Sequence, residues 1–244
     1  MTVSSFLTSD GVVVPAITAT EMREVDRLAI EEIGPNLYQM MENAGRNLAL
    51  AVIEKLGSDW ISRPIVVLAG TGGNGGGGIC AARHVANRGA DVTVVVSDIS
   101  GLTPVPREQL SVYQGTDGRL ATPNRVASLE ASIVVDPVIG YSLSGALHGA
   151  AYDLIDWANH QPSPVIAPDV PSGLDSTTGA AAGVHTEADL TLTLALPKTG
   201  LDVPAVGELW LADIGIPIQV YRRLGVEIPV GMFAAGYRVR LRPG

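Results

Sequence analysis

The chain has 244 residues, enough to bury the core of one large α/β domain. A hydrophobic share of 46% and a charged share of 17% are typical of a folded globular protein and exclude a solvated disordered chain. The formal net charge of −9, from 16 Lys and Arg against 25 Asp and Glu, repels a phosphate backbone, so we expect no nucleic-acid partner.

The N-terminal residues, MTVSSFLTSDG, lack the basic start and continuous apolar core of a signal peptide. No uninterrupted apolar stretch reaches the ~18 residues of a membrane span. We therefore expect a cytoplasmic protein with no membrane partner.

Two helices are predicted after an extended segment that runs to Pro15. Residues 18–21 (TATE) have the form of a capping box, and apolar residues at helical spacing continue to Gly34-Pro35, which ends the first helix. The second helix is predicted from near Asn36 to Gly57. The pattern alone places Glu42 and Asn43, inside this helix, on its solvated face.

A strand–helix–strand unit follows, formed by residues 65–70 (IVVLAG), 79–89 (ICAARHVANRG) and 91–97 (DVTVVVS). Both strands are continuous apolar runs, as expected of parallel strands covered on both faces. Cys80 lies where the helix is expected to begin. We interpret it as a buried packing residue rather than an acidified thiol, and it has no partner for an internal disulfide.

The alternation continues after a polar segment over residues 101–124. Further strands are predicted in SIVVDPVIG, PVIAPDVPSG, DLTLTLAL and GELWLADIG, with a helix over residues 147–159. Six strands alternating with helices predict a doubly wound, mostly parallel sheet that binds ligands at the carboxyl ends of its strands. Little helix separates the last two strands, so we expect an antiparallel or edge arrangement there. The tail after Ile216 has no assigned element.

Residues 70–78 (GTGGNGGGG) contain seven glycines in nine positions, directly after a predicted strand. They satisfy G-x-G-x-x-G, and Asp98 follows the next strand where a ribose-binding acid is sought, so one candidate is a dinucleotide site. The alternatives are a tight turn and, for Asp98, a loop acid.

Polar side chains lie at the predicted strand ends. Asp136 and Asp169 each close a strand, and the carboxyl ends of parallel strands share one edge with the glycine segment, so Asn74 is expected near both. Ser172 and Lys198 add a hydroxyl and a cation at this edge. The alternative is that Asp169 and Asp175 only cap loops.

Other chemistry has weak support. His84, His148, His160 and His185 show no zinc-ligand spacing. Residues 140–145 (GYSLSG) fail the G-x-S-x-G register of a serine hydrolase.

Five segments in this order, MMENAG (40–45), GTGGNGGGG (70–78), VVDPVIG (134–140), PDVPSGLD (168–175) and ALPKTG (195–200), resemble the NAD(P)H-hydrate epimerase family, also called the YjeF N-terminal domain. The resemblance covers residues 18–216 and implies a single domain over residues 1–244 with irregular extensions at both ends. It implies a three-layer α/β/α sandwich, Rossmann-like, that converts the R epimer of hydrated NADH or NADPH (NAD(P)HX) to the S epimer. A companion ATP- or ADP-dependent dehydratase, expected on a separate chain, then restores the cofactor.

The resemblance also implies site residues. Asn74, Asp136 and Ser172 are implied to bind one potassium ion. Asp169, beside the hydrated nicotinamide ring, is the expected catalytic residue, with Lys198 as the second candidate. Glu42 and Asn43 are now expected to face the site. The implied cradle for the dinucleotide consists of Gly72, Gly73, Asn74, Gly75, Gly76, Gly77, Gly140, Tyr141, Ser142, Leu143, Ser144 and Gly145.

The glycine segment departs from the family's usual loop, GPGNNGGDG. Here Thr71 replaces Pro, Gly73 replaces the first Asn and Gly77 replaces Asp, so two polar side chains are missing. Two alternatives to the epimerase therefore stay open: a binding or scaffold module without the chemistry, and modified chemistry on another small molecule. The preference between NADHX and NADPHX and the oligomeric state, with a homodimer as one option, also stay open.

Overall fold

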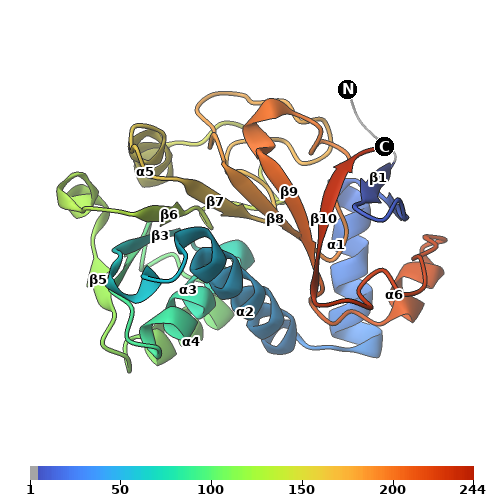
Figure 1. Ribbon diagram of the computed structural model, residues 1–244, viewed down its shortest axis with the longest axis horizontal. Coiled ribbons are helices and arrows are strands. Elements are labelled where there is room, and N and C mark those ends of the chain that lie inside the picture. The colour runs from blue at the N-terminus through green and yellow to red at the C-terminus, as the bar shows by residue number, and fades with distance from the viewer. Residues whose placement is uncertain (1–4) are drawn as a thin grey trace.

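The computed structural model describes residues 5–244, and the first four residues of the N-terminal segment discussed above lie outside this range. Within this described range, ten strands form one sheet in the order β2-β1-β10-β9-β8-β7-β6-β3-β4-β5 (Figure 1). Within the described range, no helix has the length and apolar character that crossing a membrane requires.

The strands are β1 (Ser5–Thr8), β2 (Val13–Pro15), β3 (Ile65–Ala69), β4 (Val92–Val96), β5 (Arg119–Ala121), β6 (Ile133–Val135), β7 (Val165–Pro168), β8 (Leu190–Leu194), β9 (Glu208–Ala212) and β10 (Arg238–Pro243). The α-helices are α1 (Ala19–Leu28), α2 (Leu37–Leu56), α3 (Gly73–Ala86), α4 (Pro104–Tyr113), α5 (Gly149–Asn159) and α6 (Ile218–Arg223). A π-helical turn, Ala29–Ile33, extends α1, and short 3-10 helices cover Trp60–Ser62, Pro123–Ser128 and Pro204–Val206.

Seven neighbouring strands, β5, β4, β3, β6, β7, β8 and β9, are all parallel. The six predicted strands are among them, so the mostly parallel sheet is confirmed. The expected antiparallel or edge arrangement of the last two is wrong, because β8 and β9 pair in parallel. Residues 195–207 between them are long enough to carry the chain back across the sheet with only a 3-10 turn.

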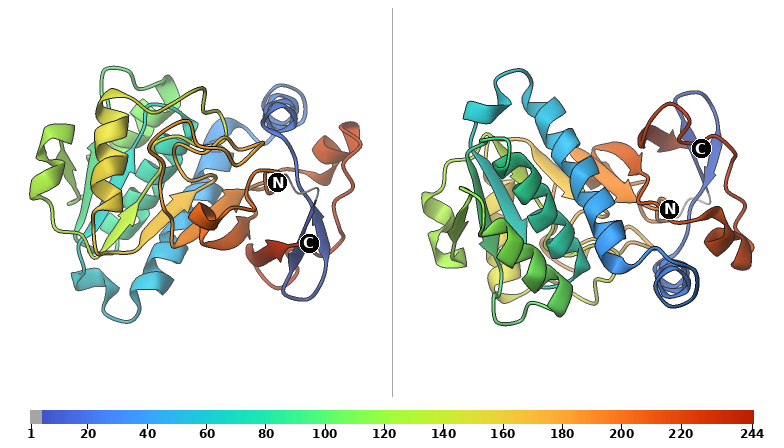
Figure 2. Two further views of the ribbon diagram at one scale, coloured as in Figure 1. Left: turned by 90° about the horizontal axis from the view of Figure 1, so that it is seen from above. Right: turned by 90° about the horizontal axis from the view of Figure 1, so that it is seen from below.

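Helices cover both faces of the sheet, which gives the three predicted layers (Figures 1 and 2). Along β3, Val67 and Ala69 pack with residues of α2 and α3, whereas Val66 and Leu68 pack on the opposite face with residues of α5. A strand buried on both faces has no polar alternation, which explains the continuous apolar run.

Within residues 5–244, both terminal extensions contain regular elements, where the sequence predicted irregular ones: β1 and β2 at one end, α6 and β10 at the other. β10, within the tail that the sequence left unassigned, pairs antiparallel with both β9 and β1. Because β1 and β10 come from opposite ends of the chain, their pairing brings the two terminal segments side by side (Figure 1). β1 pairs in turn with β2. These pairings cover what is otherwise an open edge of the parallel sheet.

The predicted helix starts are confirmed for α1 and α2, whose caps Thr18 and Asn36 each form a capping box. The prediction for α3 is wrong, because the helix begins at Gly73 and includes the glycines. Cys80 therefore lies in the middle of α3, where burial raises the pKa of its thiol to about 12. This agrees with a packing role and excludes an acidified thiol.

Close packing explains why glycines form the first turns of α3. A Cβ atom on Gly78 would lie 2.1 Å from Cγ of Pro137, and one on Gly76 would lie 2.7 Å from Sδ of Met41. The helix is thereby pressed against α2 and the end of β6. Gly77, between these positions, has no atom within 4 Å of its Cβ position.

These neighbours provide a matched pair of variants. We expect Gly78→Ala to lower the free energy of unfolding by ~1–3 kcal/mol, because the added methyl group overpacks against Pro137. Gly77→Ala should leave it unchanged or raise it by up to ~1 kcal/mol, because alanine favours the helix. Urea unfolding measures both values, and equal midpoints for the two variants would contradict this explanation.

Candidate active site

The sheet has a topological switch point between β3 and β6. From β3 the chain moves to β4 on one side, and β6, β7 and β8 follow in order on the other. Loops leaving the carboxyl ends of β3 and β6 therefore diverge, which is where open α/β sheets bind ligands. The backbones touch at this point: the Gly70 N–H donates to the Pro137 carbonyl oxygen at 3.1 Å, and a Cβ on Gly70 would lie 1.8 Å from the Val138 oxygen.

A cavity of about 210 Å³ lies at this edge. Eight of the residues predicted from the sequence line it: Gly73, Asn74, Gly77, Gly140, Tyr141, Ser142, Asp169 and Lys198. Asp26 adds a carboxyl group that was not predicted. The remaining lining is mostly apolar and comes largely from α1 and α2: Met22, Leu37, Met40, Met41, Ala44, Leu48, Pro168, Leu194 and Ile214.

Asp169 and Lys198 form a buried ion pair at the centre of the site. One carboxylate oxygen of Asp169, Oδ1, contacts Lys198 Nζ, and the other, Oδ2, accepts the Tyr141 N–H at 2.8 Å. Lys198 is fully buried and also donates to the Leu194 carbonyl oxygen at 2.9 Å. Asp169 has a left-handed φ of 68°, a conformation that costs energy for a non-glycine residue and is often found at functional sites.

Tyr141 connects this pair to Asp26. Its hydroxyl donates to Asp26 Oδ2 at 2.6 Å. Burial raises the pKa of Asp26, although the hydrogen bond from Tyr141 and the charge of Lys198 oppose the shift. The sequence contains one signal for Asp26 that was missed: it lies four residues after Met22, so helical spacing places a carboxyl group on the buried face of α1.

The glycines of α3 have two roles. Gly75, Gly76 and Gly78 allow close packing, whereas Gly73 and Gly77 lie one turn apart along the cavity with no atom within 4 Å of their Cβ positions. The first-turn amides have no intrahelical partners and form a favourable site for an anion. Asn74 has a buried amide nitrogen, Nδ2, without a hydrogen-bond partner. A buried unpaired polar atom of this kind points to a missing ligand.

Asp136 and Ser172 bind each other beneath the cavity. Asp136 is fully buried and accepts hydrogen bonds from the Ser172 N–H at 2.9 Å, the Ser172 hydroxyl at 2.6 Å and the Thr186 hydroxyl at 2.6 Å. Burial raises the pKa of Asp136 to about 6. Among residues 5–244, no Lys, Arg or His forms an ion pair with it. A buried carboxylate without a cationic partner, next to a hydroxyl oxygen, fits a hard metal cation.

The structure does not bring Glu42 and Asn43 to the cavity. α2 faces the cavity with Met40, Met41, Ala44 and Leu48, so the helical period turns residues 42 and 43 elsewhere. Asn43 donates to the Ile214 carbonyl oxygen at 3.1 Å.

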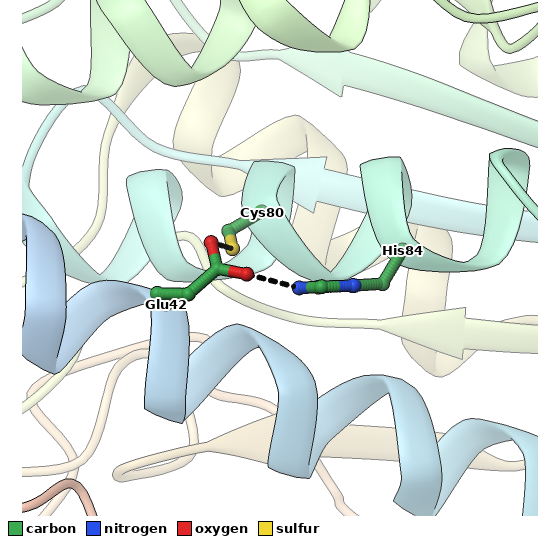
Figure 3. A group of neighbouring side chains, drawn as sticks. All are labelled: Glu42, Cys80 and His84. Atoms are coloured by element: carbon green, nitrogen blue, oxygen red, sulfur yellow. Dashed lines mark hydrogen bonds and ion pairs between the residues drawn. The ribbon is translucent and has the colours of Figure 1, made fainter.

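Glu42 bridges α2 and α3 through the cluster in Figure 3. Its carboxylate oxygens lie 2.8 Å from His84 Nε2 and 3.3 Å from Cys80 Sγ. The three ligand atoms lie within 4.8 Å of one another, which is also a metal-ligand spacing. However, the guanidinium group of Arg83 contacts both Glu42 and Cys80, so the protein itself supplies the cation of this cluster.

Several other predicted residues lie away from the cavity lining: Gly72, Gly75, Gly76, Leu143, Ser144 and Gly145. Asp98 is exposed and accepts the Ser100 N–H at 2.9 Å, as a loop acid does. Asp175 accepts the N–H groups of Thr177 and Thr178 at 3.0 and 2.8 Å, so it caps a loop. Asp169, in contrast, belongs to the site.

A model of the family described as "YjeF-related protein N-terminus" matches residues 37–200. The NAD(P)H-hydrate epimerase of Dehalogenimonas lykanthroporepellens is 50% identical over 97% of this chain and 96% of its own length. The bifunctional NAD(P)H-hydrate repair enzyme Nnr of Hyperthermus butylicus is 40% identical over 93% of this chain but only 42% of its own length. The crystal structure of yeast ynu0, YNL200c, shares the fold, with a TM-score of 0.81, 19% identity, and coverage of 93% of this chain and 100% of that one.

We expect the loss of one partner of the buried ion pair to be costly, because the other charge then stays buried without compensation. Lys198→Met leaves the Asp169 carboxylate without its cation and should lower the free energy of unfolding by about 3–5 kcal/mol. Adding Asp169→Asn should recover most of that loss, because neither charge then remains buried. Urea unfolding of the two single variants and the double variant measures the coupling, and additive losses would argue against a strong pair.

Proposed function

The chain belongs to the YjeF-related N-terminal family, and we propose that it is an NAD(P)H-hydrate epimerase, an isomerase that interconverts the R and S forms of hydrated NADH and NADPH. The observation that carries this conclusion is the 50% identity to the Dehalogenimonas epimerase over nearly the whole length of both chains. The site geometry supplies residues of the right chemistry for the reaction.

The cavity suits the reacting ring rather than the whole substrate. Its volume of about 210 Å³ is below the ~300–1,000 Å³ typical of pockets for drug-sized ligands. We place the hydrated nicotinamide ring in it, beside Asp169. The pyrophosphate then lies at the N-terminus of α3, where the free amides favour an anion and the bare surfaces of Gly73 and Gly77 permit close approach.

The reaction exchanges a hydroxyl group between the two faces of one ring carbon. The lone pair of the ring nitrogen helps expel the hydroxyl as water and leaves an iminium ion, to which water returns on the other face. In this proposal Asp169 carries a proton in these steps, while Lys198 and the Tyr141 N–H each hold one of its oxygens. The apolar side chains of α1 and α2 limit access of bulk water to the iminium ion.

The scaffold alternative rests on the bare Gly73 and Gly77. Against it, a buried ion pair with a left-handed aspartate at its centre contributes little to stability compared with apolar packing. A chain that only binds or scaffolds has no need of this pair, whereas a strained backbone conformation at a buried charged residue that lines a cavity is often found at functional sites. The enzyme is therefore the favoured function.

The epimerase supplies the S epimer to a second activity. We propose that an ATP- or ADP-dependent dehydratase then acts on the S epimer and restores the cofactor, because the Hyperthermus relative is a bifunctional NAD(P)H-hydrate repair enzyme.

We also propose that Asn74, Asp136 and Ser172 bind one potassium ion. The supporting observation is the buried Asp136 carboxylate without an ion-pair partner, next to the Ser172 hydroxyl. The unpaired Asn74 Nδ2 is a hydrogen-bond donor, so the potassium ligand of Asn74 in this proposal is its amide oxygen. When bound, the ion balances the charge of Asp136. The Ile139 N–H donates to Ser172 Oγ at 2.9 Å, so this cluster also holds the segment that carries Gly140 to the cavity.

Potassium should raise the melting temperature at pH 8 more than an equal concentration of tetramethylammonium, which is too large for an oxygen cage. The difference should shrink at pH 5. Burial raises the pKa of Asp136 from 3.8 to about 6, so the folded chain binds this proton more tightly than the unfolded chain. When no ion is bound, the contribution of Asp136 to the free energy of unfolding therefore falls as the pH rises from about 4 to about 6. A bound cation offsets this loss of stability.

Thermal melting in the two salts measures the effect, with Asp136→Asn as the variant that should lose it. Identical melting temperatures of the native chain at pH 8 would rule out an occupied site.

Asp169→Asn tests the catalytic role. It keeps the size of the side chain but removes the proton-carrying group, so the epimerisation rate should fall by ~10²–10⁴-fold. The measurement couples an epimer mixture to a dehydratase that consumes only the S form, well below the melting temperature of each variant. Asp175→Asn changes an exposed carboxylate in the same turn and should keep the native rate.

A native chain that does not accelerate loss of the R epimer in potassium buffer would refute the epimerase function. A fully active Asp169→Asn variant would refute only the role of this residue.

A further inference from the structure

The cavity contains two carboxyl groups, and the mechanism above uses only one. Within the described range, Asp26 and Asp169 are the only acidic residues that line it. They come from different elements, since Asp169 follows β7 and Asp26 belongs to α1. The substrate ring therefore meets carboxyl groups from two elements that are far apart in the sequence.

Tyr141 holds these two groups at a fixed separation. Its N–H donates to Asp169 Oδ2 at 2.8 Å, and its hydroxyl donates to Asp26 Oδ2 at 2.6 Å. The carboxyl groups are thus kept apart by the length of one tyrosine residue, with the cavity beside them. Inverting glycosidases separate two carboxyl groups in a similar way, so that one protonates the leaving oxygen while the other activates water on the opposite face of a cationic ring carbon.

The two carboxyl groups have different environments. Asp169 contacts the cationic Lys198, and as the anionic partner of this ion pair it is the group that can accept a proton. Asp26 has Tyr141 as its partner, and burial raises its pKa. The other ionisable groups that act on Asp26 are Lys198, which opposes the shift, Asp169, which reinforces it, and Tyr221 of α6. Two carboxyl groups with contrasting environments are the usual arrangement for an acid and a base.

We infer that Asp26 is a second catalytic residue, the acid that protonates the leaving hydroxyl while Asp169 deprotonates the water that returns to the opposite face. This role rests on the epimerase function proposed above and assigns the two proton transfers to different residues.

The step balances without an oxidant or a reductant. The C–O bond breaks as the oxygen takes the proton of Asp26 and leaves as water, and the ring nitrogen lone pair forms the C=N bond of the iminium ion. Water then forms the new C–O bond on the other face, its proton passes to Asp169, and the C=N electrons return to nitrogen. One proton has moved from Asp26 to Asp169, and exchange with solvent or the reverse reaction returns it.

The alternative is that Asp26 only anchors the Tyr141 ring. Asp26→Asn separates the two roles, because an amide oxygen still accepts the tyrosine hydroxyl but cannot donate the acid proton. We expect kcat for R-to-S conversion to fall by ~10²-fold or more, with KM changed only a few-fold and an unchanged melting temperature. Glu24→Gln, on the same helix but paired with Arg27 at the surface, should keep the native kcat.

The pH profile gives a second measurement that does not depend on that variant. Native kcat should fall at high pH as Asp26 loses its proton, and Asp26→Asn should lack this limb. The hydrogen bond from Tyr141 lowers the pKa of Asp26, so Tyr141→Phe should move the limb to higher pH. A purely anchoring Asp26 predicts no such movement.

The inference is overturned if Asp26→Asn keeps the native kcat, if it changes only KM, or if Tyr141→Phe leaves the high-pH limb in place. Each of these outcomes requires an active native enzyme. A native chain without epimerase activity refutes the proposed function instead, so the two failures are distinguishable.

Discussion

The site depends on the close approach of two backbones at the ends of β3 and β6. Gly70 leaves no room for a side chain because its Cβ position lies 1.8 Å from the Val138 oxygen, and that of Gly75 lies 2.0 Å from the Gly70 oxygen. The turn after β3 is therefore tight enough for α3 to begin at once, with its N-terminal amides at the edge of the sheet. Any larger residue at these positions displaces the helix, and the anion site, the bare cavity wall and Asn74 move with it.

The charges of the site occupy the space that this packing creates. A buried Asp169–Lys198 pair is costly to desolvate, and its geometry has to be maintained by several neighbours. Leu194 binds the ammonium group, and Tyr141 binds the carboxylate through its N–H and Asp26 through its hydroxyl. Tyr141 thus couples the loop after β6 to the end of β7 and to α1. The reacting groups depend on tertiary contacts among three segments and not on one motif.

The seven glycines after β3 do not share one explanation. Those at 75, 76 and 78 are required by packing against the sheet edge and α2, whereas those at 73 and 77 face open space in the cavity. The two departures that remove polar side chains, Gly73 and Gly77, fall on these open positions, so the fold tolerates their loss there. At Gly73 and Gly77 the cavity wall is bare backbone, so the space that side chains would fill at these positions is open to the substrate.

The sequence by itself determined the elements whose signals are local. The capping boxes at Thr18 and Asn36, the continuous apolar strands and the Asp residues that close β6 and β7 follow from nearest neighbours along the chain. A parallel sheet then brings strand ends to one edge, so the meeting of Asp169 with Lys198 near Asn74 was predictable.

Only the tertiary structure decided the features that depend on distant partners. β10 joins the sheet because β9 and β1 offer unpaired edges, and no local pattern shows this. Glu42 contacts α3 and Asp26 lines the cavity because packing brings these partners to the helix faces on which the two residues lie. A helical period places a residue on a face of its helix, but the partner of that face is set by packing between elements far apart in the chain.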